Sequence, residues 1–352
     1  MDNRLKTITI RITPAILRAI AEIDEFKGAW QALGRLAPER LNRLRHVATV
    51  ESIGSSTRIE GAKLSDQEVD RLLSRIDIQT FGTRDEQEAA GYAAVMETVF
   101  ANHEAIDLTE NHIRQLHRDL LQYASKDERH RGEYKTLDNH VEAFGPDGES
   151  LGVIFETATP FETPARMEGL VAWTRQALHQ GALHPLMVIA VFVVVFLAIH
   201  PFQDGNGRLA RVLTTLLLLR AGYRYVPYSS LEGVIERSKD QYYRALRRTQ
   251  VTLRTTEPDW QPWIEYLLSA LRSQKHALEE KIRRERIILG SRPRLSIQIL
   301  EIARDHGCVT VAEAVKLTGA NRNTVKDHIK ALAAAGHLQR HGAGRGTWYS
   351  AA

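Results

Sequence analysis

Residues 200–211 read HPFQDGNGRLAR, and they lie between two segments that we expect to be helices. Residues 186–199 are almost entirely apolar, which predicts a buried core helix. That run is shorter than the roughly 20 residues that a membrane-spanning helix needs. A Gly-Asn-Gly segment at 205–207 then breaks the pattern, and a second helix is expected from Arg208. The stretch therefore predicts a loop held between two packed helices.

The composition of the 352-residue chain, 43% hydrophobic and 26% charged, is typical of a soluble globular protein with two or three domains. Its single cysteine, Cys308, excludes an internal disulfide and a multi-cysteine zinc site, which suits a reducing compartment. The first residues lack the long apolar core and cleavage site of a secretory signal. We therefore expect a cytoplasmic protein with no role in a membrane.

Helical spacing of apolar residues dominates the chain and predicts a mostly α fold. One region differs, because the turn sequence GPDG at 145–148 separates two short strand-like runs. We expect one β-hairpin there. The helices expected around it are a helical region over 15–75 and helices at 86–102, 109–123, 164–180, 185–199, 208–221, 239–249 and 262–289.

A charged stretch at 273–286, followed by Gly-Ser-Arg-Pro at 290–293, indicates a domain boundary. Beyond it the pattern predicts three helices, at 295–306, 311–318 and 321–335, and then two short strands around a glycine-rich turn at 342–346. That order is typical of a winged helix-turn-helix. Residues 291–352 hold nine Lys or Arg and four Asp or Glu, a net charge of +5, so the rest of the chain carries −1 of the total of +4.

The loop at 200–211 gathers groups that suit phosphate chemistry. A neutral imidazole at His200 can accept a proton from an attacking hydroxyl, and Asp204 supplies a hard oxygen ligand for Mg²⁺. The backbone N–H groups of Gly205-Asn206-Gly207 come at a helix N-terminus, which favours an anion. Arg208 and Arg211 are three residues apart and hence on one helical face. Base, metal ligand, anion site and two guanidinium groups thus fall within one short loop.

Each of these signals is weak when it stands alone. A single His at a helix end is more often structural, Asp-Gly and Asn-Gly are common turn dipeptides, and two Arg on a helix are usually a solvated face. Their combination in one loop favours the functional interpretation.

The stretch at 200–211 also resembles the signature of the Fic family, H-x-F-x-[DE]-G-N-G-R-x-x-R, at every fixed position. The resemblance implies a Fic-type helical bundle with one β-hairpin flap. It also implies an enzyme that transfers AMP from ATP to Ser, Thr or Tyr hydroxyls of target proteins, with pyrophosphate as the leaving group. Related Doc-type kinases lack the GNGR ending and transfer a phosphoryl group, whereas this sequence keeps the ending.

The resemblance implies a role for each residue of the loop. His200 would deprotonate the target hydroxyl, Phe202 would pack the loop down, and Asp204 would hold Mg²⁺. The residues implied to contact the ATP phosphates are Gly205, Asn206, Gly207, Arg208 and Arg211, the two arginines binding the outer phosphates.

An upstream segment, Ser56-Thr-Arg-Ile-Glu60-Gly61, resembles the inhibitory motif [ST]-x-x-x-E-[GN] of N-terminally autoinhibited Fic proteins. A carboxylate from Glu60 that reached Arg211 would form a charge-assisted pair and occupy the place of the γ-phosphate. ATP would then bind with its α-phosphorus misaligned for attack. The alternative is a chance pair, because Ser and Glu four residues apart are common on surface helices.

Two further segments resemble substrate-binding parts of the family. The hairpin at 137–157 resembles the flap, which lines up a target segment by strand addition, although it could also be a plain structural hairpin. In the segment DQYYRAL at 240–246, Tyr243 would stack on adenine and Gln250 would reach the base. The family often has Asn at the place of Gln250, and Tyr242 could equally be a core residue.

The last helix, at 321–335, places Val325, Ile329 and Leu332 on one face, which is how a recognition helix divides its surface. The polar residues expected on the other faces and on the wing are Arg322, Asn323, Lys326, Lys330, Arg340, His341 and Arg345. DNA binding through 292–352 is one interpretation. Protein contacts or dimerisation are the other, and the resemblance implies a homodimer.

These observations predict four parts: an N-terminal helical region at 1–110 with an inhibitory helix at about 50–64, a Fic catalytic core at 111–270, a linker helix at 271–291 and a winged helix-turn-helix at 292–352. Two other functions stay open. The first is a DNA-binding regulator that uses the helical body as a nucleotide sensor. The second is Fic chemistry with another donor or in reverse, removing AMP. A sensor needs the phosphate site but has no use for a base at His200.

Overall fold

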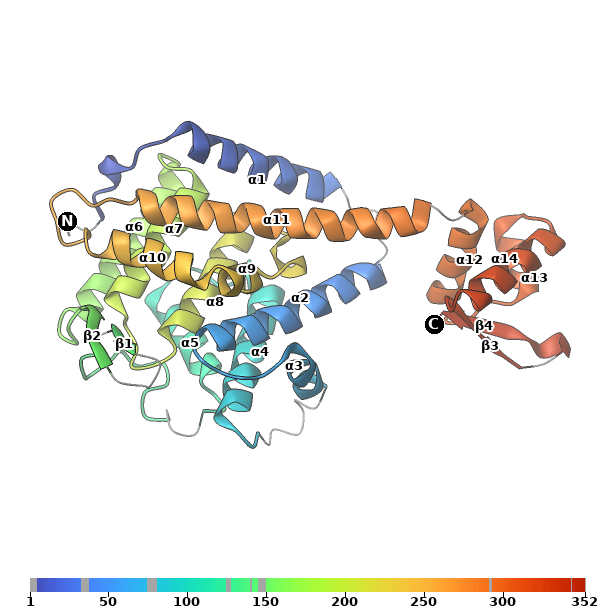
Figure 1. The fold of residues 1–352 in the computed structure, drawn as a ribbon, viewed down its shortest axis with the longest axis horizontal. Coiled ribbons are helices and arrows are strands. Elements are labelled where there is room, and N and C mark those ends of the chain that lie inside the picture. The colour runs from blue at the N-terminus through green and yellow to red at the C-terminus, as the bar shows by residue number, and fades with distance from the viewer. Residues whose placement is uncertain are drawn as a thin grey trace. The chain divides into compact units, whose positions relative to one another are not determined.

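The computed structural model describes residues 5–32, 38–74, 81–124, 128–139, 141–144, 150–290, 293–342 and 344–351 (Figure 1). The chain divides into two compact units, residues 1–278 and 279–352. One long helix, α11 (Gln261–Gly290), continues across the division.

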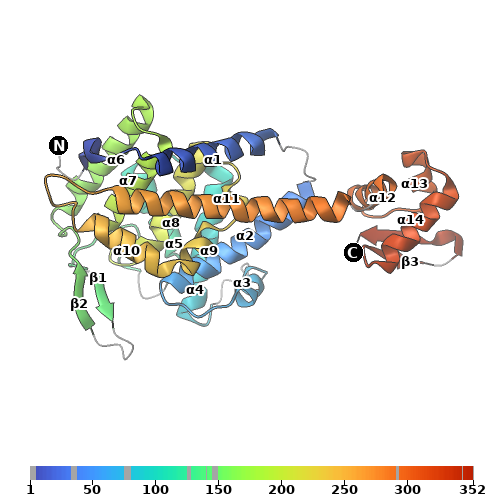
Figure 2. The same ribbon diagram turned by 45° about the horizontal axis from the view of Figure 1, so that its top comes forward.

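Where the structure describes it, the first unit is helical apart from one small antiparallel sheet, which confirms the mostly α fold expected from the sequence (Figures 1 and 2). Besides α11, its elements are η2 (Thr7–Thr9), α1 (Pro14–Ala32), α2 (Pro38–Ile59), α3 (Asp66–Leu73), α4 (Arg84–Asn102), α5 (Glu110–Leu120), β1 (Val141–Phe144), β2 (Ser150–Phe155), α6 (Thr163–Gln180), α7 (Pro185–Ile199), α8 (Asn206–Arg220), η5 (Val226–Tyr228), α9 (Leu231–Arg237) and α10 (Lys239–Gln250).

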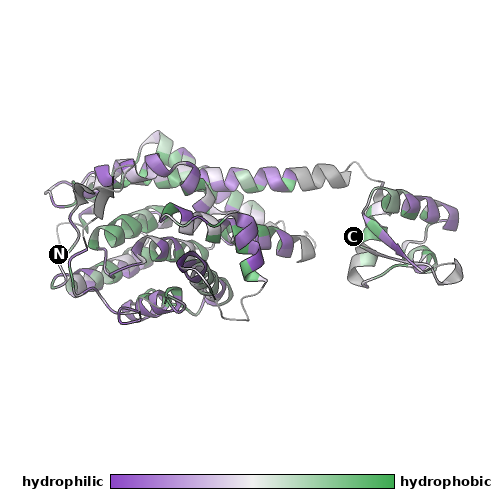
Figure 3. Ribbon diagram, turned by 60° about the horizontal axis from the view of Figure 1, so that its bottom comes forward, coloured by the Kyte–Doolittle hydropathy of each residue, from purple (hydrophilic) through white to green (hydrophobic). Residues whose placement is uncertain are grey.

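Helix α7 forms the centre of this unit. Every residue from Leu186 to Ile199 is buried, and α6, α8 and α10 pack around it. Apolar residues gather on inner helices in Figure 3, coloured green. No helix within the described ranges is long and apolar enough to cross a membrane. Because α7 is buried and packed by its neighbours, it fixes the position at which the loop at 200–211 begins.

Helix α8 begins at Asn206, two residues before the start that the sequence predicted, because Gly205 caps it in the left-handed conformation with φ 75°. Glycine adopts that conformation without the steric cost that a Cβ atom brings. The Gly-Asn-Gly segment is therefore already part of the first turn of the helix.

Helix α2 ends beside this turn. It packs against α4, α8 and α9, and its last turn is closed by Gly61, whose φ of 106° lies in the region that favours glycine. Glu60 stands in the turn just after the helix, inside the segment expected to be inhibitory. The short helix α9, which buries Leu231, Val234 and Ile235 next to α2, was not predicted.

The β-hairpin lies where the sequence placed it. β1 and β2 pair antiparallel, with Val141 opposite Phe155 and Phe144 opposite Ser150, and the register shifts at two points. The tip, including the GPDG turn, lies outside the described residues. The hairpin's role as a flap stays a prediction.

The second unit contains the C-terminal turns of α11, three further helices and a two-stranded antiparallel sheet, in the order that the sequence indicated. Its elements after α11 are α12 (Arg294–Asp305), α13 (Val311–Thr318), α14 (Arg322–Ala334), β3 (Leu338–His341), η6 (Gly344–Gly346) and β4 (Trp348–Ala351). Val325, Ile329 and Leu332 of α14 are buried in its apolar core. The side chain of Arg345 lies outside the described residues.

Candidate active site

His200 terminates α7 in a left-handed conformation, φ 53° and ψ 61°. Of the non-glycine residues that the structure describes, it alone has a positive φ. Such backbone costs roughly 1–2 kcal/mol and is concentrated at functional sites. Burial, reinforced by the positive charge of Lys135, lowers the pKa of His200 to about 4. Its imidazole is therefore neutral at neutral pH and can accept a proton.

The loop after His200 is held by its own side chains. The Asn206 side chain accepts a hydrogen bond from the Phe202 backbone N–H at 2.9 Å and donates one to the Phe202 carbonyl oxygen at 2.6 Å. Phe202 is fully buried, and its ring stacks on His117 of α5 with 3.8 Å between the ring centroids. Phe202 thus packs the loop down, while the Asn206 side chain is used within the loop.

His117 also fixes the backbone at Asp204. Its Nδ1 accepts a hydrogen bond from the Gly132 N–H at 2.9 Å, so Nε2 carries the proton and donates to the Asp204 carbonyl oxygen at 3.0 Å. Burial lowers the pKa of His117 to about 4, which keeps it in this neutral form. His117 was not among the residues predicted to belong to the site.

Glu60 lies against the N-terminus of α8. A Cβ atom built on Gly207 would stand only 2.2 Å from Glu60 Oε1, so the carboxylate occupies the space directly over this first turn. The first N–H groups of a helix have no partner within the helix and favour an anion. A carboxylate here therefore sits where a phosphate would be favoured.

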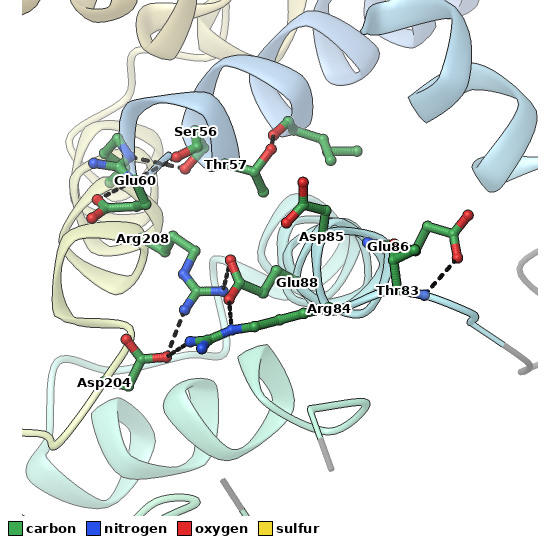
Figure 4. A network of polar contacts seen from close by, with 12 residues as sticks. Ser56, Thr57, Glu60, Thr83, Arg84, Asp85, Glu86, Glu88, Asp204 and Arg208 are labelled. Atoms are coloured by element: carbon green, nitrogen blue, oxygen red, sulfur yellow. Dashed lines mark hydrogen bonds and ion pairs between the residues drawn. The ribbon is translucent and has the colours of Figure 1, made fainter. Parts of the chain in front are cut away.

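The Arg211 guanidinium is buried and holds the end of α2. Its Nε donates to Ser56 Oγ at 2.8 Å, and its Nη2 donates to the Ser56 carbonyl oxygen at 2.9 Å and to Glu60 Oε1 at 2.8 Å. The contact between Glu60 and Arg211 that the sequence suggested is thus present. Figure 4 shows Ser56 and Glu60 side by side on this helix end.

Arg208 has different partners. Its guanidinium lies 3.1 Å from Glu88 Oε2 and 3.0 Å from Asp204 Oδ2, and only 2% of its side-chain surface is exposed. Arg84, from the start of α4, pairs with the same two carboxylates at 2.7 and 3.3 Å (Figure 4). Arg208 therefore supports Asp204 in this structure, and its contact with outer phosphates stays a prediction.

A cavity of about 810 Å³ opens beside the loop. It brings together eight of the predicted residues: Glu60, His200, Asp204, Gly205, Asn206, Gly207, Tyr243 and Gln250. The predicted residues that do not line it are Ser56, Gly61, Phe202, Arg208 and Arg211. Each of these lies in the loop or in the helix end that covers it.

Helix α10 forms the other wall of the cavity. Tyr242, Tyr243 and Gln250 all line the cavity. Tyr243 is 41% exposed, whereas Tyr242 is only 5% exposed because its ring packs on Trp263 and Tyr266. Tyr243 is thus the ring open to stacking. Four cations of α10 also line the cavity, namely Lys239, Arg244, Arg247 and Arg248. These four cations were not predicted from the sequence, although the density of basic residues within 239–248 was a visible signal.

Comparison with known proteins supports a family assignment. Residues 107–218 match the model of the Fic/DOC family. The chain is 25% identical over 269 residues to the protein adenylyltransferase Fic of Drosophila virilis, covering 76% of this chain and 50% of that protein. The chain thus spans about half the length of this relative.

Solved structures show the same fold. A Fic family protein from Desulfovibrio desulfuricans G20 matches over 97% of both chains with a TM-score of 0.62 and 23% identity. A Fic domain containing signalling protein from Bacteroides thetaiotaomicron matches 74% of this chain and 97% of its own, with a TM-score of 0.57 and 28% identity. The matched residues 107–218, which run from the start of α5 into α8 and hold the whole loop at 200–211, are a Fic domain of the Fic/DOC family.

Proposed function

We propose that this protein is a protein adenylyltransferase that moves AMP from ATP to a hydroxyl group of a target protein. The observation that carries the proposal is one cavity in which a neutral His200 faces both a helix N-terminus and an exposed Tyr243. The name of the Drosophila virilis relative agrees with this activity.

The chemistry begins at His200. Its Nδ1 lies 3.4 Å from the Leu197 carbonyl oxygen, which favours the proton on Nδ1 and leaves Nε2 to accept. As the target oxygen attacks the α-phosphorus of ATP, its proton passes to Nε2. A new P–O bond forms, the bond from the α-phosphorus to the bridging oxygen breaks, and pyrophosphate leaves.

The cavity offers one surface for the phosphates of the nucleotide and another for its adenine. The phosphates fit the first turn of α8 at Gly205-Asn206-Gly207, where backbone N–H groups and the helix dipole favour negative charge. The adenine fits against the Tyr243 ring, with the Gln250 amide within the same cavity. Arg211 would bind the outer phosphate once Glu60 withdraws.

The Asp204 carboxylate is a suitable ligand for a Mg²⁺ ion that would bind together with the nucleotide. No group of three or more His, Cys, Asp or Glu side chains suited to a metal was found among the residues that the structure describes. The Asp204 side chain is 38% exposed, lines the cavity and keeps one oxygen, Oδ1, outside its contacts with the two arginines. Mg²⁺ typically takes one or two carboxylates and completes its shell with phosphates and water. When bound, it would neutralise charge on the phosphates.

Autoinhibition by Glu60 is part of the proposal. The carboxylate pairs with Arg211 and covers the first turn of α8, so it competes for both groups that the outer phosphate needs. ATP would therefore bind in a pose that does not align its α-phosphorus with the attacking hydroxyl.

The test uses the full chain with ATP labelled at either the α- or the γ-phosphate. We expect transfer from the α-labelled ATP only, more of it in Glu60→Gly and none in His200→Ala. Transfer from the γ-label would mean phosphorylation. Removal of AMP from a labelled protein, with no forward transfer in any variant, would favour the reverse reaction.

For the second unit we propose DNA binding by a winged helix-turn-helix, with the protein as a homodimer. The supporting observation is that Arg322, Lys326 and Lys330 of α14 are exposed and lie outside its buried apolar stripe. Binding of the full chain to duplex DNA should weaken with added salt and in Lys326→Glu. Absence of DNA binding at low salt would instead favour a role of this unit in protein contacts. Analytical sedimentation of the full chain would show whether the protein is a homodimer.

A further inference from the structure

Lys135 is a buried cation just before the hairpin, and the mechanism above does not use it. Only 3% of its surface is exposed. Its Nζ donates to Asn139 Oδ1 at 2.7 Å, to Thr157 Oγ1 at 2.9 Å and to the Ile199 carbonyl oxygen at 3.2 Å. All three protons of the ammonium group are therefore used.

Two of these acceptors bracket the hairpin. Asn139 stands two residues before β1, and Thr157 stands two residues after β2. Their side-chain oxygens are also 3.2 Å apart. Lys135 thus closes the base of the hairpin by joining the chain that enters it to the chain that leaves it.

The remaining contacts reach the catalytic loop. The Lys135 backbone N–H donates to the Pro201 carbonyl oxygen at 2.9 Å. The Asn139 side-chain amide donates to the carbonyl oxygens of Phe202 at 2.6 Å and His200 at 3.4 Å. Together with the bond from Lys135 Nζ to Ile199, these contacts hold every carbonyl oxygen from residue 199 to residue 202.

A lysine is a costly choice for a purely structural contact. Among the side chains that the structure describes, no carboxylate contacts its ammonium group. Burial lowers the pKa of Lys135 to about 8, against the weaker attraction of Asp138 and Glu162. Its retained charge also acts on the neighbouring base, since Lys135 contributes to the lowered pKa of His200. Lys135 thus keeps a positive charge next to the imidazole of His200, which its contacts hold in position.

We propose that Lys135 is a positioning residue that ties both ends of the β1–β2 hairpin to the loop of His200, so that a target segment held by the hairpin presents its hydroxyl in register with the base. This inference rests on the proposed transfer of AMP for its activity measurements, while its structural part can be tested without activity.

The test compares isosteric variants of the full chain in the Glu60→Gly background. Lys135→Met removes the ammonium group and keeps the length of the side chain, and Thr157→Val removes one acceptor. Thr174→Val is the matched control, because Thr174 is equally buried but its hydroxyl bonds only the Leu170 carbonyl oxygen within α6.

The first measurement is hydrogen exchange of backbone amides. We expect amides in 150–157 and in 199–206 to exchange faster together in Lys135→Met and Thr157→Val, and neither segment to change in Thr174→Val. Faster exchange on one side only would overturn the proposal, and so would no change on either side. If Lys135→Met does not fold, Thr157→Val decides this measurement.

The second measurement separates positioning from nucleotide binding. With α-labelled ATP and the chain itself as acceptor, we expect the rate at saturating ATP to fall at least about tenfold in Lys135→Met, equivalent to about 1.4 kcal/mol. The ATP dissociation constant should stay within about twofold. A loss of ATP affinity as large as the loss of rate would overturn the proposal. If the Glu60→Gly parent transfers no label, the proposed function fails, and hydrogen exchange alone decides whether Lys135 links the hairpin to the loop.

Discussion

Glu60 Oε1 lies 2.8 Å from Arg211 Nη2, and the same carboxylate covers the first turn of α8 at Gly207. One side chain thus occupies both the cation and the backbone donors that an outer phosphate would use. This relationship, between a residue just after α2 and a residue in α8, joins the N-terminal helices to the Fic domain at the loop of residues 200–211.

Replacing Glu60 should release the site. We expect Glu60→Gly to increase the rate of AMP transfer roughly tenfold or more, because a charge-assisted hydrogen bond contributes about 1.5–3 kcal/mol. The rate with α-labelled ATP measures this. Glu97→Gly, on the exposed side of α4, makes the same change away from the cavity and should leave the rate unchanged. An equal rate in Glu60→Gly and the parent would reject the inhibitory role.

The pH dependence of transfer should reflect the lowered pKa of His200, about 4. A base must be unprotonated, so the rate should stay level as the pH falls from about 7, where Lys135 is still charged, to about 5, and decline only as the pH approaches 4. The measurement is kcat/KM over this range in Glu60→Gly, restricted to pH values at which the fold persists. A decline centred near the ordinary histidine value of about 6.5 would contradict this environment for His200.

Acid should destabilise the fold partly through His117, whose pKa is lowered to about 4. Because the unfolded chain binds this proton more readily, the unfolded state is favoured increasingly as the pH falls from 6.5 to about 4. We expect a loss of about 1–3 kcal/mol from this group over that range. Urea unfolding at several pH values measures it.

His117→Phe is the comparison for that measurement, since it keeps a ring against Phe202 and removes the titrating group. The variant should be less stable at pH 7, because it loses two hydrogen bonds, but its stability should depend less on pH. The stability of the variant should still depend on pH to some extent, because the pKa of His200 is also lowered. Equal pH dependence in both proteins would exclude a contribution from His117.

The ion pairs of the two arginines around Asp204 should contribute differently to the free energy of unfolding. Arg208 is 2% exposed and depends on Glu88, so Glu88→Leu leaves a buried cation with one partner fewer and should cost about 3–5 kcal/mol of unfolding free energy. Arg84 is 57% exposed, and Arg84→Met should cost less than about 1 kcal/mol. Urea unfolding compares them, and equal losses would show that burial does not set the strength of these pairs.

The loop and its contact with Glu60 could be predicted because their information is local. His200, Asp204 and the Gly-Asn-Gly segment follow one another in the chain, and the spacing from Ser56 to Glu60 is itself a motif. The hairpin was readable from its turn residues and strand-like runs. The order of the helices followed from apolar periodicity.

The supports of the loop could not be predicted in the same way. His117, Lys135 and Glu88 reach it from segments distant in sequence, and only packing brings them together. Spacing placed Arg208 and Arg211 on one helical face, yet the structure gives them different carboxylates, because α4 supplies one partner and the end of α2 the other. Helix α9 spans just Leu231–Arg237, which is too short for its periodicity to identify it.

The contacts to the carbonyl oxygens at 199–202 are made to main-chain atoms, and they do not depend on the side chains at 201 and 203. Pro201 and Gln203 occupy the two variable places of H-x-F-x. The position of His200 can therefore tolerate substitutions at these two places, because the anchoring contacts are made to peptide groups that every amino acid has.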